Sequence, residues 1–260
     1  MQPRVNEAQL RSLVMRWVIV GFRTAATWIV GVLITIICAT LVLITAFINN
    51  TSPFIDKIIR FWSRTWILMA GAKLTIEGQE HVDSNSSYVV VANHLSTLDI
   101  MAAFLAIRLP IRFLAKTELF KIPLFAQGMR VVGMVEVDRE ARGAVHATVN
   151  RQAKELIAKK RSLIIYPEGT RPRDGVMKRF KKGAFTMAIA SQLPVLPMSI
   201  HGSYEAFPPG KLWVYGGPIR IVIDPPIETA GLDHSDTGDL RDQVYKIIAG
   251  RVTAMGGEVA

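Results

Sequence analysis

The feature that most constrains this chain is a run of 25 residues without a charged side chain, residues 24–48, of which 19 are apolar. As a helix the run would extend roughly 37 Å, at about 1.5 Å per residue, whereas the hydrocarbon core of a bilayer is about 30 Å thick. It is longer, and lies further from the N-terminus, than the apolar region of a signal peptide. We interpret it as a membrane anchor, and a buried core helix is the alternative.

Basic residues stand on both sides of this run, so counting positive charges assigns no orientation to it. Arg4, Arg11, Arg16 and Arg23 precede it, and Lys57, Arg60 and Arg64 follow it. Symmetric basic flanks also suit a hairpin that enters and leaves the same leaflet, with a bend near Gly31. The sequence leaves both a span and a hairpin open.

The next segment, residues 54–70, mixes aromatic and basic side chains. Its apolar members are Phe54, Ile58, Phe61, Trp62 and Trp66. This pattern predicts an interfacial helix with its aromatic rings at headgroup depth and its cations toward anionic lipid. An ordinary amphipathic helix packed on the domain is the alternative. We expect residues 1–72 to form the anchor and residues 73–260 the remaining domain.

From residue 73 onward, apolar strand patterns alternate with helical ones. Strands are predicted at 73–78, 88–93, 111–116, 131–137, 162–166 and 194–200, with two more within 212–223, and helices at 98–109, 139–160, 182–191 and 239–255. The run at 88–93 is nearly continuous in β-branched residues, which is typical of a strand buried on both faces. The alternation predicts an α/β fold with a mixed β-sheet flanked by helices.

The net charge of +10 is unusual beside a positive mean hydropathy of +0.28. The charge is local. Residues 1–72 carry seven basic and two acidic side chains, and residues 171–182 carry six basic and one acidic. Two such patches do not form the diffuse coat of a nucleic-acid binder, so no nucleic-acid partner is expected. The one cysteine, Cys38, excludes an internal disulfide and a multi-cysteine metal site.

The first chemical signal follows the strand at 88–93. His94 comes at its carboxyl end, where α/β sheets place ligands, and Asp99 lies five residues further on. A carboxylate on one ring nitrogen fixes the tautomer of a histidine and stabilises the imidazolium that forms when the other nitrogen takes a proton. His234 and Asp239 have the same spacing, but they lie in a polar turn that we expect to cap the last helix.

The second signal is the turn Glu168-Gly169-Thr170-Arg171, which follows the strand at 162–166. The planar guanidinium of Arg171 suits a phosphate, and Glu168 can accept a hydrogen bond from a substrate hydroxyl. No Gly-x-Ser-x-Gly turn is present to supply a serine nucleophile, and Cys38 lies in the apolar run.

Together these two motifs resemble the glycerolipid acyltransferases, and within that family they are most similar to the 1-acyl-sn-glycerol-3-phosphate acyltransferases. Two weaker blocks, Gly133–Arg139 and Leu193–Pro197, agree in order and spacing, so the resemblance covers roughly residues 73–225. It implies an enzyme of phospholipid biosynthesis that moves a fatty acyl group from acyl-CoA or acyl-carrier protein to the sn-2 hydroxyl of 1-acyl-glycerol-3-phosphate, giving phosphatidic acid.

The resemblance also implies roles for single residues. His94 would deprotonate the acceptor hydroxyl while Asp99 holds it. The substrate-binding residues would be Glu168, Gly169, Thr170 and Arg171, with Lys116 and Arg139 as further phosphate contacts. No metal is expected, because the sequence contains no cluster of ligand residues. No cofactor is expected either, since the acyl donor is a co-substrate. The expected partners are the lipid bilayer, lysophosphatidic acid and the acyl donor.

Two alternatives remain open: an acyltransferase for another lysophospholipid or related acceptor, and a non-catalytic membrane protein that binds anionic lipid. The expected location is the cytoplasmic face of the inner membrane, where acyl donors are made. A single span would then place the arginine-bearing N-terminus outside, and for this reason we favour the hairpin or a re-entrant anchor.

Overall fold

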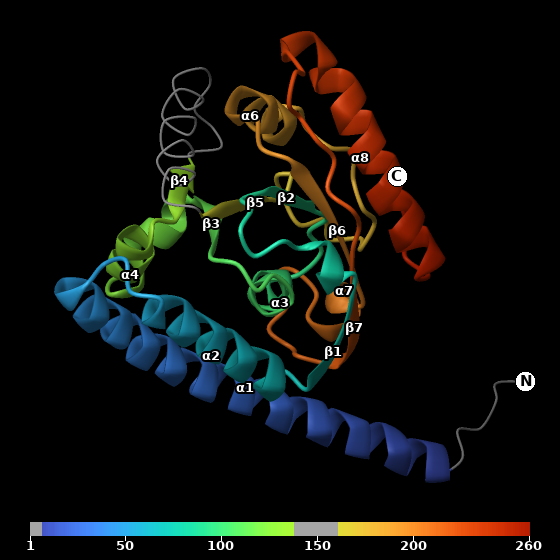
Figure 1. Ribbon diagram of the computed structural model, residues 1–260. Helices are drawn as coiled ribbons and strands as arrows, with labels where there is room; N and C mark the ends of the chain where they lie inside the picture. The colour runs from blue at the N-terminus through green and yellow to red at the C-terminus, as the bar shows by residue number, and fades with distance from the viewer. Residues whose placement is uncertain (1–6, 138–160) are drawn as a thin grey trace, which may run out of the picture.

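The computed structural model describes residues 7–137 and 161–260, which contain a seven-stranded sheet in the order β1-β7-β6-β2-β5-β3-β4 (Figure 1). The strands are β1 (Ala72–Glu77), β2 (Val89–Ala92), β3 (Ile111–Lys116), β4 (Val135–Val137), β5 (Ser162–Ile165), β6 (Val195–His201) and β7 (Gly217–Ile223). Neighbouring strands are parallel except for β6 and β7, which are antiparallel. The predicted mixed α/β sheet is confirmed.

Helices cover both faces of this sheet, and strand β2 shows why its sequence is apolar throughout. The covering helices are α3 (Leu98–Ala106), α6 (Gly183–Ser191) and α8 (Thr237–Ala254). Val89 and Val91 belong to the core that includes α6 and α8, whereas Val90 and Ala92 belong to the core that includes α3. Because successive strand side chains point to opposite faces, a strand covered on both sides needs no polar positions.

Two long helices lie below the α3 face of the sheet (Figure 1). Helix α1 (Glu7–Ile48) continues for 42 residues, and α2 (Phe54–Met69) packs along its C-terminal part. The predicted bend near Gly31 is therefore wrong, because α1 continues through this residue and the chain turns only between α1 and α2. A Cβ atom at Gly31 would lie 2.5 Å from the indole of Trp66, so this glycine allows α2 to approach α1 rather than bending the chain.

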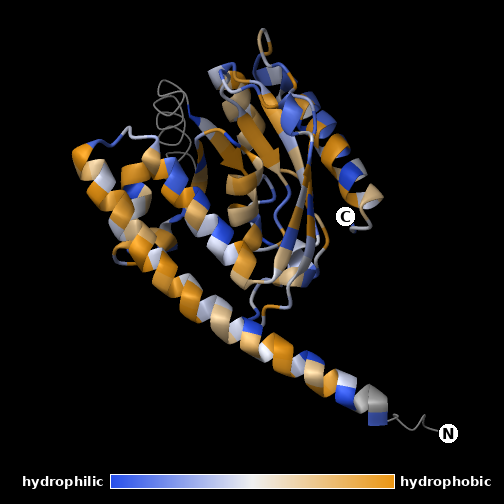
Figure 2. Cartoon of the chain, turned by 60° about the horizontal axis from the view of Figure 1, so that its bottom comes forward, coloured by the Kyte–Doolittle hydropathy of each residue, from blue (hydrophilic) through white to orange (hydrophobic). Residues whose placement is uncertain are grey.

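Helix α1 is hydrophobic along most of its length (Figure 2), and many of its large apolar side chains are exposed. Phe22 and Phe47, for example, are 79% and 93% exposed. The stretch Arg11–Ile48 is long and apolar enough to cross a membrane, and α1 is a candidate membrane anchor. On α2, Trp66 is buried, so it does not have the headgroup position expected for it.

Two predicted segments differ from the structure. The start of the predicted strand 131–137 belongs to helix α4 (Phe125–Val132), which ends at Gly133 with a left-handed φ of 86°. Within residues 212–223 there is one strand, β7, where two were predicted. The segment before β7 crosses α1 as a loop, where the Val214 N–H donates to the Thr24 hydroxyl (3.0 Å) instead of to a strand. The predicted helix 139–160 lies outside the described residues.

The remaining elements are short. They are the 3-10 turns η1 (Gln79–His81), η2 (Thr117–Lys121) and η3 (His234–Asp236), and helix α7 (Ser203–Ala206).

Candidate active site

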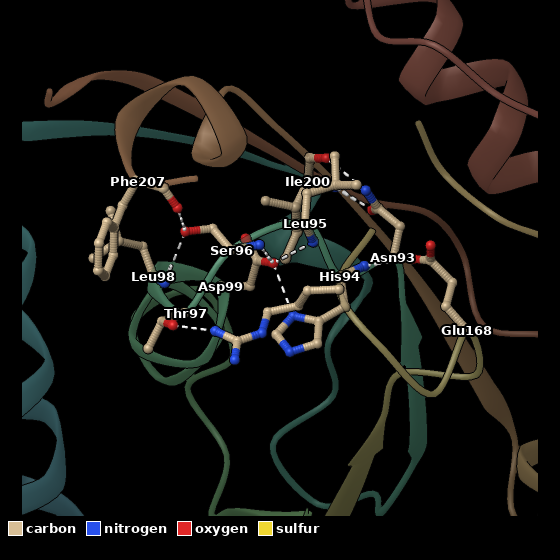
Figure 3. Close-up of polar contacts among 11 residues, drawn as sticks. Asn93, His94, Leu95, Ser96, Thr97, Leu98, Asp99, Glu168, Ile200 and Phe207 are labelled. Atoms are coloured by element: carbon tan, nitrogen blue, oxygen red, sulfur yellow. Dashed lines mark hydrogen bonds and ion pairs between the residues drawn. The ribbon is translucent and has the colours of Figure 1, made fainter. Parts of the chain in front are cut away.

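His94 and Asp99 form a buried pair at the carboxyl end of β2 (Figure 3). The His94 Nδ1–Asp99 Oδ2 distance is 2.9 Å, and the two residues are 7% and 0% exposed. Asp99 Oδ2 also accepts hydrogen bonds from the Leu95 and Ser96 N–H groups, both at 2.7 Å. With Nδ1–H donating to the carboxylate, the basic lone pair belongs to Nε2, which is the arrangement a general base requires.

The turn that carries this pair is held in place by hydrogen bonds from the side chains of Asn93 and Ser96 to backbone groups of other segments. Asn93 is fully buried; its amide NH2 donates to the Ile200 carbonyl and its amide oxygen accepts from the Ile200 N–H, both at 2.8 Å. Ser96 donates to the Phe207 carbonyl (2.7 Å) and accepts from the Leu98 N–H (3.2 Å). These bonds fasten the end of β2 to β6 and to the start of α3, so the histidine sits on a rigid support.

Glu168 has a structural position that differs from the one expected for a substrate ligand. Its carboxylate is buried; Oε1 accepts from the His94 N–H (2.7 Å) and Oε2 from the Lys178 N–H (2.9 Å). Burial raises the pKa of this carboxyl from 4.5 to about 7. Glu168 therefore links the turn after β5 to the turn that carries His94. A contact between Glu168 and the substrate stays a prediction.

Three of the predicted substrate-binding residues line the same cavity as His94: Thr170, Arg171 and Lys116. The Arg171 guanidinium donates to the hydroxyl of Thr97 in the turn before α3. The Lys116 ammonium lies 3.8 Å from the Glu118 carboxylate, and both side chains are at least half exposed. The cations therefore stand at the open edge of the site, where a phosphate can reach them from water.

Lys181 lies against Gly169, the residue between Glu168 and Thr170 in the turn after β5. Gly169 has a φ of +79°, and the Lys181 Nζ lies 3.0 Å from the point where a Cβ on Gly169 would be. A side chain at this position would be strained and would push against the lysine. Gly169 thus brings a second ammonium group over the turn that carries Arg171.

The cavity beside His94 has a volume of about 700 Å³ and is assembled from helices that are distant in sequence. Its apolar lining includes Cys38 and Val42 of α1, Ile58 and Ile59 of α2, Met101 and Phe104 of α3, and Phe125 and Met129 of α4. A pocket of this size takes a small-molecule ligand. Its lining combines the cations Lys116, Arg171 and Arg173 with mostly apolar side chains, as an amphiphilic ligand requires.

The structure thus brings His94, Asp99, Glu168, Gly169, Thr170, Arg171 and Lys116 into one region, while Arg139 lies outside the described residues. Sequence reasoning did not single out Tyr166, whose ring lies against His94, or Thr97. For Tyr166 a signal existed, because it stands between β5 and Glu168. Across residues 7–137 and 161–260, no group of three histidine, cysteine, aspartate or glutamate side chains could hold a metal ion.

Comparisons with known proteins agree on one family. The family model described as Acyltransferase matches residues 73–201. A 1-acyl-sn-glycerol-3-phosphate acyltransferase of Borreliella burgdorferi is 30% identical over 68% of this chain and 72% of its own length. The chloroplastic enzyme of that name from Arabidopsis thaliana is 30% identical over 79% of this chain and 58% of its own length.

A solved structure also matches. The crystal structure of the 1-acyl-sn-glycerophosphate acyltransferase PlsC from Thermotoga maritima superposes with a TM-score of 0.80 and 26% sequence identity, covering 92% of this chain and 97% of that one. The chain spans about half the length of the plant relatives it matches, with shares of 58%, 52% and 45%.

Proposed function

The chain belongs to the acyltransferase family, and from this premise we propose that it moves a fatty acyl group from a thioester donor to the sn-2 hydroxyl of 1-acyl-glycerol-3-phosphate. The thioester is that of acyl-CoA or acyl-carrier protein, and the product is phosphatidic acid. The observation that carries the proposal is the buried His94–Asp99 pair, whose histidine lines a cavity that combines cations with a mostly hydrocarbon lining.

The proposed reaction needs one base and no enzyme nucleophile. His94 Nε2 takes the proton of the acceptor hydroxyl as its oxygen attacks the thioester carbonyl carbon. Asp99 stabilises the imidazolium through the Nδ1 bond. When the tetrahedral intermediate collapses, the C–S bond breaks and the thiolate leaves with the proton that His94 returns. The new ester bond joins the acyl group to the glycerol oxygen.

The phosphate of the acceptor is proposed to lie against Arg171, with Lys181 and Lys116 nearby. Arg171 is exposed and lines the cavity next to His94. A guanidinium donates two parallel hydrogen bonds to phosphate oxygens, which fixes the orientation of the acceptor as well as its charge. This contact would place the free hydroxyl on the His94 side of the cavity opening.

The acyl chain is proposed to occupy the apolar end of the cavity. That end is closed by α1 and α2 on one side and by α4 on another, and its lining is almost entirely hydrocarbon. An extended acyl chain gains free energy from leaving water, by about 0.8 kcal/mol for each buried CH2 group. Because the lining includes helices of the candidate anchor, the acyl chain could enter the cavity directly from a bilayer.

We propose that α1 and α2 hold the protein on one leaflet, rather than α1 crossing the bilayer. The rest of the chain packs along α1 at several points: Thr27 bonds the Met69 carbonyl (2.8 Å), and Trp28 bonds the Leu212 carbonyl (3.0 Å). A span surrounded by lipid could not keep the contact with Leu212, which lies in the loop before β7 of the catalytic domain. The exposed face of α1 supplies the apolar surface, and the basic residues Lys57 and Arg64 on α2 are exposed toward anionic headgroups.

Thiol labelling distinguishes the two arrangements. Arg11→Cys and Asn49→Cys place a thiol at each end of α1, in a Cys38→Ala background, with the full chain in sealed vesicles. An impermeant reagent added to the side of the catalytic domain labels both sites if α1 lies in one leaflet. Labelling of only one site from that side would show that α1 spans.

An acceptor panel tests the proposed activity. Purified full-length protein is assayed with palmitoyl-CoA and, in turn, lysophosphatidic acid, lysophosphatidylcholine and glycerol 3-phosphate. We expect phosphatidic acid from lysophosphatidic acid at the highest kcat/KM. Preference for another acceptor would support the proposed acyl transfer but would contradict lysophosphatidic acid as the acceptor. Binding of anionic lipid without product from any acceptor would refute the enzyme.

A further inference from the structure

Tyr166 lies flat against the catalytic histidine. The ring centroids of His94 and Tyr166 are 4.0 Å apart and their planes differ by 12°. Strands β2 and β5 are neighbours in the sheet, so the residues that follow them come side by side. Phe113 of β3, the next strand, also lies against Tyr166, with ring centroids 5.9 Å apart and planes that differ by 28°. Three adjacent strands thus contribute one stack of rings beneath the cavity.

The hydroxyl of Tyr166 does not explain why this residue is here. Its oxygen is buried and has no hydrogen-bond partner among the residues that the structure describes. Burial, and then the nearby charge of Asp99, hold the pKa of the Tyr166 hydroxyl well above its ordinary value. A buried hydroxyl without a partner destabilises the folded state, so the aromatic face is the part of Tyr166 that serves the site.

We propose that Tyr166 is a positioning residue for His94, an assignment that rests on the proposed acyl transfer. Its ring holds the plane of the imidazole and stabilises, through its negative π face, the imidazolium that forms when Nε2 takes the proton. Asp99 restrains His94 at Nδ1, Glu168 restrains its backbone N–H, and Tyr166 restrains the ring face. The base is thereby fixed in three directions.

The charged groups that face this stack come from three elements. Asp99 belongs to α3, Glu168, Arg171 and Arg173 to the segment after β5, and Lys116 to β3. Substitution of Tyr166 leaves all five in place. A change in pH dependence between two Tyr166 variants therefore reports the ring and not these charges.

Two substitutions separate the ring face from the hydroxyl and from simple packing. Tyr166→Phe keeps the face and removes the hydroxyl, whereas Tyr166→Leu keeps apolar bulk and removes the π system. Both are assayed as the purified full chain with palmitoyl-CoA and lysophosphatidic acid across a pH series. Turnover by the wild-type protein tests the proposed function by itself, and the comparison of the two variants tests Tyr166.

We expect Tyr166→Phe to keep kcat within about two-fold of wild type, with an equal or higher melting temperature. We expect Tyr166→Leu to lower kcat about ten-fold while KM stays within about two-fold, because a ten-fold loss matches the interaction of a cation with a desolvated ring. Its acidic limb should also move about half a pH unit or more to lower pH, because the imidazolium loses a stabilising neighbour.

Two results would overturn the assignment. Wild-type kcat and wild-type pH profiles in both the Leu and the Phe variants would mean that Tyr166 only fills space. Equal losses in both variants would place the effect in the hydroxyl. If Tyr166→Leu does not fold, as judged by circular dichroism, Tyr166→Met gives the same comparison with a more adaptable apolar side chain.

Discussion

The chain contains two histidines that are each followed five residues later by an aspartate, and the structure pairs only one of them. His94 and Asp99 are joined at 2.9 Å and are almost fully buried. His234 and Asp239 are both exposed, and within the described residues no hydrogen bond or ion pair joins them. The same spacing in the same chain thus gives a candidate base in one place and a surface segment in the other.

The difference lies in the backbone on which each pair stands. His94 ends a buried strand, and the turn after it directs the Leu95 and Ser96 N–H groups at the carboxylate. His234 begins a 3-10 turn that leads into α8, where Asp233 accepts from the Ser235 N–H (2.7 Å) as a cap. In a helix, residues five apart point about 140° away from each other, so such a pair cannot meet. A strand end, not the spacing, makes the pair.

After loss of the histidine itself, the largest effect that would sharpen this comparison is expected from the two aspartates. Asp99→Asn removes the charge that stabilises the imidazolium and puts an amide where three donors converge, so kcat should fall about 10³-fold. The matched change Asp239→Asn should leave kcat within about two-fold, because Asp239 is exposed and unpaired with His234. Steady-state assays of both variants measure the contrast, and similar kcat values for the two would remove its basis.

The next effect concerns Arg171, the cation that lines the cavity beside the first pair. Arg171→Ala should raise KM for lysophosphatidic acid about 10- to 100-fold, since charge-assisted hydrogen bonds contribute about 1.5–3 kcal/mol. Arg179→Ala is the control, because Arg179 lies over the ring of Tyr245, 5.0 Å from its centroid. Titration of the acceptor at saturating acyl-CoA checks the prediction. An unchanged KM in Arg171→Ala would mean that the phosphate of the acceptor does not bind at Arg171.

A smaller effect is expected from the carboxylate that supports the His94 backbone. Glu168→Gln leaves one of two buried N–H groups without its acceptor, at a cost of about 1–3 kcal/mol in unfolding free energy. Loosening of His94 should lower kcat about ten-fold. Glu136→Gln serves as the control, because the Glu136 carboxylate is partly exposed and its ion pair with Arg130 is long, at 4.0 Å. Urea unfolding and kcat are measured together; full stability in Glu168→Gln would contradict this role.

Glu168 also gives a pH signature. Its pKa is raised from 4.5 to about 7 in the folded protein, so the native state binds more protons than the unfolded chain between these values. The stability that this group contributes therefore falls as pH rises from 4.5 to 7. On acidification from pH 7 to 5, wild-type protein should gain stability relative to Glu168→Gln, which has no titrating carboxyl there. A constant difference across that range would argue against the raised pKa.

The smallest effect separates two adjacent lysines. Lys181→Ala should raise KM for the acceptor about three-fold, because its ammonium lies over Gly169 but is exposed and screened by water. Lys182→Ala, one residue further on, should leave KM unchanged. Acceptor titrations at low ionic strength give the best resolution. Equal KM values for the two variants would mean that the approach of Lys181 to the turn has no function.

The parts of this molecule that could be predicted from sequence are those with a local signal. The apolar run at 88–93 predicted a strand covered on both faces, and His94 could be placed at its end. The order of the two motifs predicted the family. These inferences needed only strand periodicity and the position of polar residues after a strand.

The parts that could not be predicted depend on residues brought together by the sheet. Glu168 reads as a substrate ligand until the fold shows that its oxygens accept from the backbone of His94 and of Lys178. Gly31 suggests a bend in the sequence, whereas in the structure it leaves room for the indole of Trp66. The cavity is assembled from helices α1 to α4, and no single segment carries a signal for it.

The most direct test of the central claim, that the buried pair is the base and the exposed pair is not, is the rate of acyl transfer in His94→Ala beside His234→Ala. Both full-length variants are purified, checked for equal binding to vesicles of anionic lipid, and assayed for phosphatidic acid from palmitoyl-CoA and lysophosphatidic acid. The account predicts that His94→Ala retains less than about a thousandth of the wild-type rate, as expected for loss of a general base, while His234→Ala remains fully active. Activity near wild type in His94→Ala would contradict it.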